Sequence, residues 1–398
     1  MGDPVSAVRG VRGVTLVALM IGGLLATRLL AASGWDPTVF AAFGEDAAAL
    51  IEYSEKQLGR EVLTRPRQGH DGQHYFVQAN DPWMLNPEVN AKLLDRPAYR
   101  AQRMAYPAIA SGLGLFPPDV VVWALPIVNV IMLGVGSWAT ASIARKHGGS
   151  AWIGLAFALS PGLHSEILIG GAGIVAFAFA CVGAWALEED RAFVAASAFA
   201  VSALAREVMV AFIAFIVIFM LLRERRTRVR SSVIALPAVV AVVGWAAYIR
   251  LRIDFPGDPD QGREVTFAPF SGAVEALTSG RAGLVDYLVI AASLSLILLI
   301  PFRALRSNVH LTRGAAGFAA LGPFLSVFVW QKSFDISRAL APLFTVFALE
   351  IFLSRRRPAR RQRTGVRSSA AIMMSDSHNQ AERCRPNRYS SGAPVSTT

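Results

Sequence analysis

The stretch that decides the fold is YLVIAASLSLILLI at 287–300, and AFIAFIVIFMLL at 211–222 has the same character. Both are almost free of polar side chains, and a helix needs about 20 such residues to cross a hydrocarbon core of about 30 Å. Around them, 54% of the 398 residues are hydrophobic and 17% are charged, which is more apolar side chain than a soluble domain can bury. The sequence therefore predicts an all-α polytopic membrane protein whose partner is the lipid bilayer.

Apolar runs of similar length recur along the chain and predict about ten transmembrane helices. The predicted spans are 13–32, 119–142, 150–166, 170–187, 191–205, 206–222, 231–250, 282–301, 314–331 and 335–353. The first run also resembles a signal peptide, but its length and Arg28 favour an uncleaved span. Two alternatives affect the count. Residues 104–116 are short enough for a re-entrant or interfacial helix, and 191–222 can be one tilted helix.

The basic residues indicate the orientation of these spans. The net charge of +11 gathers at the ends of the apolar runs and in the last 45 residues, which is the positive-inside pattern and not a nucleic-acid-binding face. Both termini are therefore expected in the cytosol. Abundant Arg, Ala and Val with little Lys are typical of a GC-rich bacterial genome, so the expected location is a bacterial cytoplasmic (inner) membrane.

The predicted organisation is one membrane-embedded domain at 1–353 and a disordered basic cytosolic tail at 354–398. The domain contains a first outer loop at 33–117 and a second at 251–281. Within the first, AAFGEDAAALIEYSEKQLG at 41–59 predicts an amphipathic helix on the membrane surface. The second is rich in Pro, Gly and Asp and is interpreted as a linker.

Polar chemistry concentrates in RPRQGHDGQHYFVQANDPW at 65–83 of the first outer loop. Asp71 stands between Gly69 and Gly72, which allow a tight turn that leaves the carboxylate uncovered. The residues around it that can donate or accept hydrogen bonds are His70, Gln73, His74 and Tyr75. A structural alternative is equally open: Asp71 can cap a helix that begins near Gln73.

The same segment offers a weak metal motif. His70 and His74 stand four residues apart, a spacing that can chelate a metal on a helix, but Asp71 is the one clear third ligand nearby. A zinc site built by the protein is therefore disfavoured. With two cysteines in the chain, Cys181 and Cys384, a disulfide framework is also disfavoured.

Further ionisable residues fall at the outer ends of the predicted spans. They are Glu166, Arg206, Glu207, Lys332, Asp335 and Arg338. Charges at membrane depth are costly and often functional, although each of these can also reach the interface or pair with a neighbour. Because all lie on the side that holds Asp71, they predict a polar cavity that faces outward.

The order of these features resembles the GT-C class of bacterial membrane glycosyltransferases, which use polyprenyl-phosphate-linked sugars. The resemblance rests on a first span followed by a series of short motifs and covers roughly 13–353. The motifs are His70-Asp71-Gly72-Gln73 with Tyr75, Asp81-Pro82, Tyr99-Arg100, Arg103, Tyr106-Pro107, Pro161 and Ala205-Arg206-Glu207.

The resemblance implies a sugar transfer that inverts the anomeric centre on the outer face of the membrane. It implies a polyprenyl-phosphate-linked donor and a cell-envelope glycan, lipid or protein as acceptor. Asp71 matches the catalytic acid of such enzymes, which acts as a base on the acceptor hydroxyl or helps to hold a divalent metal such as Mg²⁺ or Mn²⁺. A second acid near that centre has three candidates, Asp81, Glu166 and Glu207, and the need for metal stays open.

The substrate-binding residues expected beside Asp71 come from the same motifs. They are His70, Gln73, Tyr75, Arg100, Arg103, Tyr106, Glu166, Arg206, Glu207 and Arg338. Arg206 and Arg338 are expected to contact the donor phosphate, since a forked guanidinium suits a phosphate.

Two other functions compete with sugar transfer. A transporter or flippase for a lipid-linked envelope intermediate is expected to carry ionisable residues near the middle of its spans or repeated halves, whereas the charges here gather at the outer ends. A membrane scaffold without activity does not readily explain a carboxylate placed between glycines in a polar loop.

Overall fold

The computed structural model describes residues 4–223, 228–252 and 264–354. The described chain is almost entirely helical, as predicted, and the residues up to Phe352 form one compact unit. The predicted tail, Ser354 apart, lies outside the described residues, as does 253–263 of the second outer loop.

Among the described helices, four are long and apolar enough to cross a membrane. The stretches that qualify are Arg9–Ala32 in α1 (Pro4–Ala32), α7 (Pro118–Lys146), Val233–Arg252 in α13 (Arg228–Arg252) and α15 (Leu284–Arg306). The pair α18 (Ser333–Ala339) and α19 (Ala341–Ser354) is bent by 69° and can form a fifth span. These helices are those of a membrane protein, and the count of ten spans stays a prediction.

Shorter or interrupted helices occupy the other predicted spans. They are α10 (Gly173–Glu188), α11 (Ala192–Ala205), α12 (Met209–Arg223) and α16 (His310–Leu321). The predicted span at 150–166 is broken into η2 (Ala151–Gly154), α8 (Leu155–Ala158) and the beginning of α9 (Pro161–Leu168). Pro161 begins α9 because proline has no N–H to donate to the preceding turn. The range 191–222 is divided into two helices, since the chain leaves helical geometry at Arg206.

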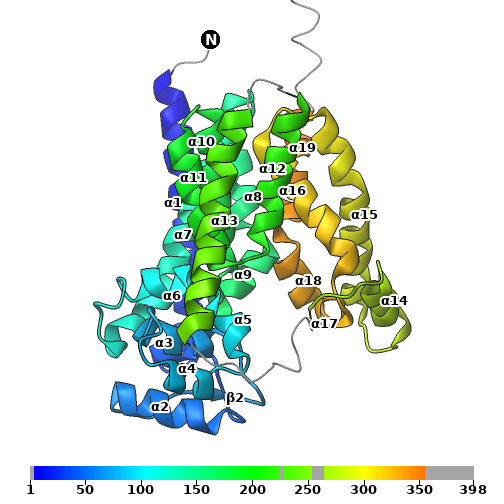
Figure 1. The fold of residues 1–398 in the computed structure, drawn as a ribbon. Helices are drawn as coiled ribbons and strands as arrows, with labels where there is room; N and C mark the ends of the chain where they lie inside the picture. Colours follow the sequence, from blue (N-terminus) through cyan, green and yellow to red (C-terminus); the bar gives the residue numbers. More distant parts are fainter. Residues whose placement is uncertain (1–3, 224–227, 253–263, 355–398) are drawn as a thin grey trace, which may run out of the picture. The chain divides into compact units, whose positions relative to one another are not determined.

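The chain between α1 and α7 folds into short elements that gather at one end of the bundle (Figure 1). They are η1 (Pro37–Phe40), β1 (Phe43–Gly44), α2 (Ala48–Leu58), β2 (Thr64–Arg65), α3 (Asp71–Asn80), α4 (Pro87–Leu93), α5 (Pro97–Ala101) and α6 (Ala105–Ala110). The amphipathic helix expected at 41–59 begins only at Ala48, because Phe43 and Gly44 pair with Thr64 and Arg65 in a short parallel ladder.

Helix α3 is held tightly at its first turn. The N–H of Gly72 donates to the carbonyl of Ile169 at 2.9 Å. A Cβ at position 72 would lie 2.6 to 2.8 Å from the carbonyl oxygens of Phe40, Ile169 and Ala41, so only glycine fits. The neighbour of this glycine, Asp71, is therefore placed by backbone contacts from two distant parts of the chain.

The described part of the predicted second outer loop is more than a linker. Residues 264–270 run beside η3 (Gly322–Phe324) and the residues after it, with an antiparallel bridge between Val265 and Leu325. Next, α14 (Ser271–Thr278) packs on α17 (Val327–Trp330), where a Cβ at Gly272 would lie 2.4 Å from the carbonyl oxygen of Leu325. The segment is thus docked on the chain that leads into α18.

Candidate functional site

A cavity of about 870 Å³ contains Asp71. Its walls come from α2, α3, the α4–α5 region, the connection between α11 and α12, and α17–α18. The structure therefore contains a polar cavity that joins the segment between α1 and α7 to later parts of the chain, and its outward orientation stays a prediction. Arginines dominate its lining: Arg96, Arg100, Arg103, Arg206 and Arg338 all contribute.

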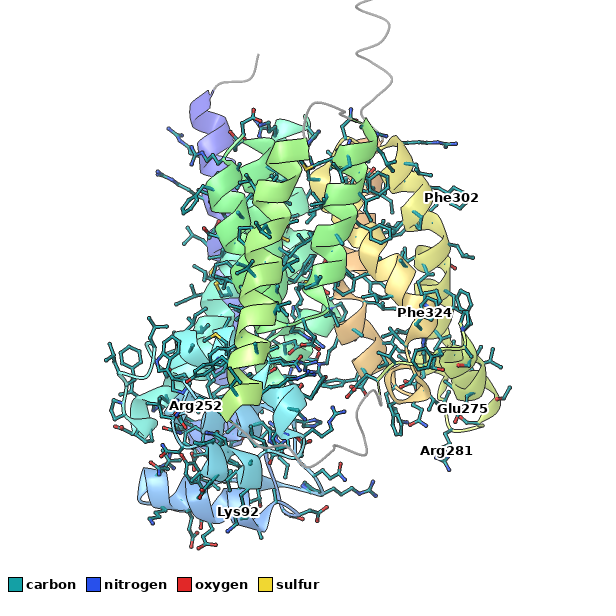
Figure 2. The ribbon with its side chains drawn as sticks, viewed as in Figure 1. Lys92, Arg252, Glu275, Arg281, Phe302 and Phe324 are labelled. Atoms are coloured by element: carbon teal, nitrogen blue, oxygen red, sulfur yellow. The ribbon has the colours of Figure 1, made fainter. Side chains whose placement is uncertain are left out.

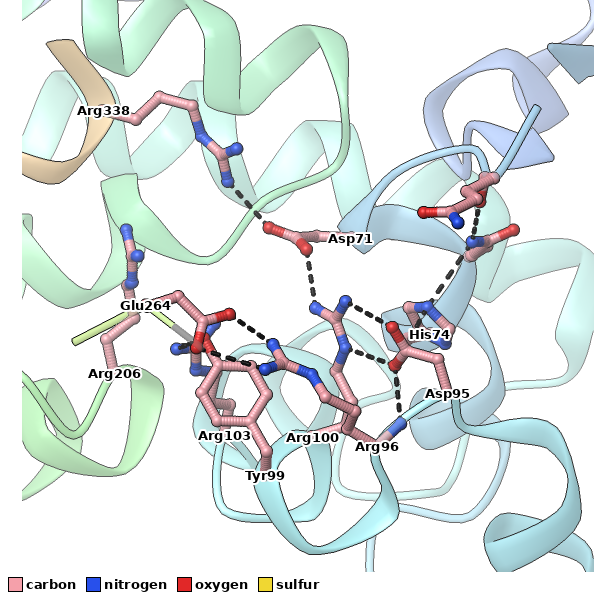
Figure 3. Close-up of polar contacts among 12 residues, drawn as sticks. Asp71, His74, Asp95, Arg96, Tyr99, Arg100, Arg103, Arg206, Glu264 and Arg338 are labelled. Carbon is pink, nitrogen blue, oxygen red and sulfur yellow. Dashed lines mark hydrogen bonds and ion pairs between the residues drawn. The ribbon is translucent and has the colours of Figure 1, made fainter. Parts of the chain in front are cut away.

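Asp71 lies between two of these arginines (Figure 3). Arg100 Nη1 donates to Oδ1 at 2.6 Å, and Arg338 Nη2 donates to Oδ2 at 2.7 Å. The side chains of Asp71, Arg100 and Arg338 are 20%, 10% and 13% exposed, so these ion pairs are largely shielded from water. Asp71 is the first residue of α3, and its carboxylate accepts from Arg100 and Arg338 and not from a backbone N–H of the helix. The interpretation of Asp71 as a helix cap is therefore wrong.

The charge state of Asp71 follows from two opposing effects. Burial raises the pKa of the carboxyl, but the positive charges of Arg100, Arg338 and Arg103 outweigh burial and hold the pKa well below its usual range. Asp71 is therefore an anion at neutral pH, and it is a weak base while both arginines hold it.

Arg100 extends this network to Asp95 and His74. Its Nε donates to Asp95 Oδ1 at 2.8 Å, and Nη2 donates to Oδ2 at 3.1 Å. Burial raises the pKa of Asp95, but the bonds from Arg100 prevail and lower it to about 2. Burial and Arg100 lower the pKa of His74 to about 4, although its Nε2 lies 3.4 Å from Asp95. His74 is therefore neutral at pH 7.

Glu166 joins two arginines that come from different parts of the chain. Its Oε1 accepts from Arg338 Nε at 3.2 Å and from Arg206 Nη1 at 3.3 Å. The Glu166 side chain is 1% exposed, and its Oε2 has no hydrogen-bond partner among the described residues. The carboxylate rests against Gly171 and Gly173, where an added Cβ would lie 1.6 and 2.3 Å from its oxygens. Glu166 thus orients Arg206 and Arg338 from a buried position.

A second group of charges forms around Tyr99. Arg103 holds Glu207 through two bonds, from Nε at 2.9 Å and from Nη2 at 2.7 Å, and it also donates to the Tyr99 hydroxyl. The guanidinium groups of Arg96 and Arg103 each lie 4.1 Å from the Tyr99 ring centre. Arg96 donates to both oxygens of Glu264, so this group reaches the segment before α14.

The structure brings together most of the charged residues expected at the site. Asp71, Arg100, Arg103, Arg206 and Arg338 line the cavity, while Glu166 and Glu207 hold its arginines.

The neutral residues expected at the site have other surroundings. Gln73 lines the cavity, but its amide is bound to backbone groups at Gly44 and Gln68. The Tyr75 and Tyr106 rings are buried and meet edge to face at 5.2 Å, and His70 lies exposed beside Phe334.

Two further carboxylates belong to the site. Asp95 supports Arg100, and Glu264 binds Arg96. Asp95 stands five residues before Arg100, a local signal that sequence reasoning can use. Glu264 lies 168 residues from Arg96, and nothing in its sequence neighbourhood points to that partner.

The donor set does not fit a divalent metal. Both oxygens of Asp71 accept hydrogen bonds from guanidinium groups, and a cation placed there would be repelled by Arg100 and Arg338. In the part of the chain that the structure describes, no three His, Cys, Asp or Glu side chains form a group that could hold a metal ion. The arrangement suits an anionic ligand better.

Comparison with known proteins finds no matching family model, no matching curated protein and no matching solved structure.

Proposed function

We propose that this protein is a membrane glycosyltransferase that moves a sugar from a polyprenyl-phosphate donor to a cell-envelope acceptor, with inversion at the anomeric carbon. The observation that carries the proposal is Asp71 in a cavity, held between Arg100 and Arg338. A carboxylate for an acceptor hydroxyl and guanidinium groups for a leaving phosphate are the two parts that such a transfer needs.

In the proposed reaction the acceptor oxygen attacks the anomeric carbon as the bond from that carbon to the phosphate oxygen breaks. The polyprenyl phosphate leaves with the electron pair, and the acceptor proton passes to Asp71. A phosphate competes with Asp71 for Arg338 and Arg100, because a guanidinium binds phosphate and carboxylate through the same fork. Donor binding thereby loosens the hold on Asp71 and makes it a stronger base.

The distribution of basic residues supports an outward-facing cavity. The cavity lies near the end of α1 and the beginning of α7. The opposite ends of α1, α7 and α15 carry the basic residues Arg9, Arg145, Lys146, Arg303 and Arg306, whereas α13 has Arg250 and Arg252 in its last turn, at the loop end (Figure 2). By the positive-inside rule the opposite ends of α1, α7 and α15 belong to the cytosol, so the cavity belongs to the outer side.

The test is transfer of a labelled sugar from polyprenyl phosphate, in native membranes that contain the acceptor. Asp71→Asn is compared with Asp46→Asn, which makes the same change at an exposed carboxylate of the cavity wall. We expect Asp71→Asn to lose at least about 100-fold in rate, the scale of a missing general base, and Asp46→Asn to keep its activity.

Thermal unfolding of each variant shows whether it is folded. A folded Asp71→Asn variant with undiminished transfer contradicts the assignment of Asp71 as the base. A wild type that transfers no sugar from any polyprenyl-phosphate donor contradicts the proposed function as a whole.

A further inference from the structure

The segment before α15 exposes a group of large apolar side chains, here named the α14 patch. It consists of Val265, Phe267, Val274 and Leu277. Phe267 is fully exposed, and Val274 and Leu277 are 57% and 38% exposed. Large exposed apolar side chains so close together in the sequence suggest a surface that contacts something other than water.

Helix α14 presents three different faces. With about 100° between successive residues, Gly272, Ala273 and Ala276 point one way and are buried. Val274 and Leu277 point about a third of a turn away and are exposed. The remaining third carries Ser271, Glu275 and Thr278. A helix at a membrane interface has three such faces: one packs on protein, one contacts lipid and one contacts water.

The α14 patch continues into a surface that faces lipid. Helix α15 begins six residues after α14, and its exposed Leu284, Val285 and Leu288 begin one of the stretches long and apolar enough to cross a membrane. Figure 2 shows Glu275 and Arg281 toward the end of the bundle where Lys92 lies, whereas Phe302 lies farther along α15. Glu275, on the polar side of α14, thus lies toward the loop end and away from the middle of the span (Figure 2).

The sequence of this segment fits that position. The charged residues of 265–288 are Glu275, Arg281 and Asp286, and Asp286 is buried where it accepts from the N–H groups of Gly283 and Ser333. A loop that faces water on all sides is expected to carry more charge.

We propose that the α14 patch rests in the lipid of the bilayer that α15 crosses, so that α14 is an interfacial anchor. This inference does not depend on the proposed sugar transfer. It commits to bilayer lipid as the occupant, because the patch is continuous with the lipid-facing side of α15.

The anchor has a consequence for the cavity. Residues 264–270 are bound to the chain before α17 through Thr266 N to Phe324 O at 2.7 Å and Ser326 N to Glu264 O at 2.9 Å. Phe328 of α17 lines the cavity and is itself half exposed. If α14 contacts lipid, the cavity wall that Phe328 forms is held at a fixed depth relative to the membrane. That wall then lies at the bilayer surface.

The experiment measures how deep single residues of α14 lie in the bilayer. The full chain, with Cys181→Ala and Cys384→Ser, is reconstituted into phosphatidylcholine vesicles. Single cysteines are introduced by Val274→Cys or Leu277→Cys, with Glu275→Cys and Thr278→Cys as matched controls on the polar face. Each is labelled with bimane and quenched by phosphatidylcholine with brominated chains or by aqueous iodide, and thermal unfolding shows that each variant is folded.

We expect brominated lipid to quench the labels at 274 and 277 several-fold more than those at 275 and 278, and iodide to show the reverse order. Phe267→Cys, outside the helix, is expected to follow 274 and provides a second reading if a helix variant unfolds. Equal quenching by iodide at 274, 277 and 275 would overturn the proposal. Protection of 274 and 277 from both quenchers would also overturn it, because protein and not lipid would then cover the patch.

Discussion

At the scale of single residues, the contacts of Asp71 have consequences for stability that do not depend on activity. The pKa of Asp71 is lowered in the folded protein, and so is that of Asp95. A carboxyl with a depressed folded pKa adds stability above its unfolded pKa of about 4, and this contribution is lost as the pH falls through the folded value. Acid therefore destabilises the site from about pH 4 downward.

Removal of the shared arginine is expected to make this acid-induced loss smaller. Arg100→Gln takes a positive charge from Asp71 and from Asp95, so their folded pKa values rise toward the unfolded value. Because the loss of stability in acid grows with the difference between those two values, the variant is expected to show a shallower acid limb than wild type. The measurement is the unfolding midpoint temperature against pH, with each protein scaled to its own value at neutral pH. Arg67→Gln, at an exposed position of the same segment, is the control and is expected to keep the wild-type profile. An Arg100→Gln profile that coincides with wild type contradicts the network.

A second prediction at this scale concerns Glu166. Glu166→Gln leaves Arg206 and Arg338 without the buried charge that orients them, and breaking a buried pair of this kind costs about 3 kcal/mol. Glu189→Gln, which breaks the exposed pair with Lys146, is expected to cost less than about 1 kcal/mol. Denaturant unfolding in detergent measures both. Equal costs for the two variants would contradict the role of Glu166 as the buried ion-pair partner of Arg206 and Arg338.

At the scale of elements, helix propensity and tertiary contacts favour different residues at position 72, in the first turn of α3. Alanine is favoured over glycine in a helix by about 1 kcal/mol, so Gly72→Ala is stabilising by local preference alone. The three carbonyl oxygens around position 72 reverse that sign, since there is no room for a Cβ. We expect Gly72→Ala to destabilise the protein by about 1–3 kcal/mol, as overpacking does.

The matched control for this prediction is Gly23→Ala in α1. An added Cβ at position 23 has nothing within 4 Å, so the same substitution is expected to be neutral or slightly stabilising. The measurement is the free energy of unfolding of each variant compared with wild type. A stabilised Gly72→Ala variant would falsify the close approach of α3 to Phe40 and Ile169.

At the scale of the whole compact unit, the ion pair between Arg96 and Glu264 links two segments 168 residues apart across the cavity. Glu264→Arg places like charges in contact, so it is expected to lower the unfolding midpoint temperature. The added change Arg96→Glu restores an opposite pair and is expected to recover part of the loss. A double-mutant cycle gives the coupling, expected at about 1 kcal/mol for contacting residues.

The same cycle on the exposed pair Lys146 and Glu189 is the reference. It tests whether the coupling across the cavity exceeds that of an ordinary surface pair. Coupling between positions 96 and 264 that is indistinguishable from zero contradicts a closed contact between the loop end and the α14 segment.

The limits of sequence reasoning are visible in particular residues. Arg338 and Arg206 stood out because a charge beside an apolar run is rare, and both line the cavity. Tyr75 and Tyr106 stood out as motif members, but their rings are buried against each other and Tyr106 donates to the carbonyl of Leu125. A tyrosine carries both an apolar ring and a polar hydroxyl, so the residue type alone does not show whether the side chain packs in the core or binds a ligand.

The helical character, and the apolar stretches in α1, α7, α13 and α15 that are long enough to cross a membrane, were determined by the sequence alone, because the period and length of apolar runs are local properties. The tertiary structure alone decided that Asp71 meets Arg338 from 267 residues away, and that Glu166 supports Arg206 and Arg338 together. The packing of whole helices determines which charged residues meet. A charge in a sequence shows that a partner is needed, whereas only the folded chain brings one within hydrogen-bond distance.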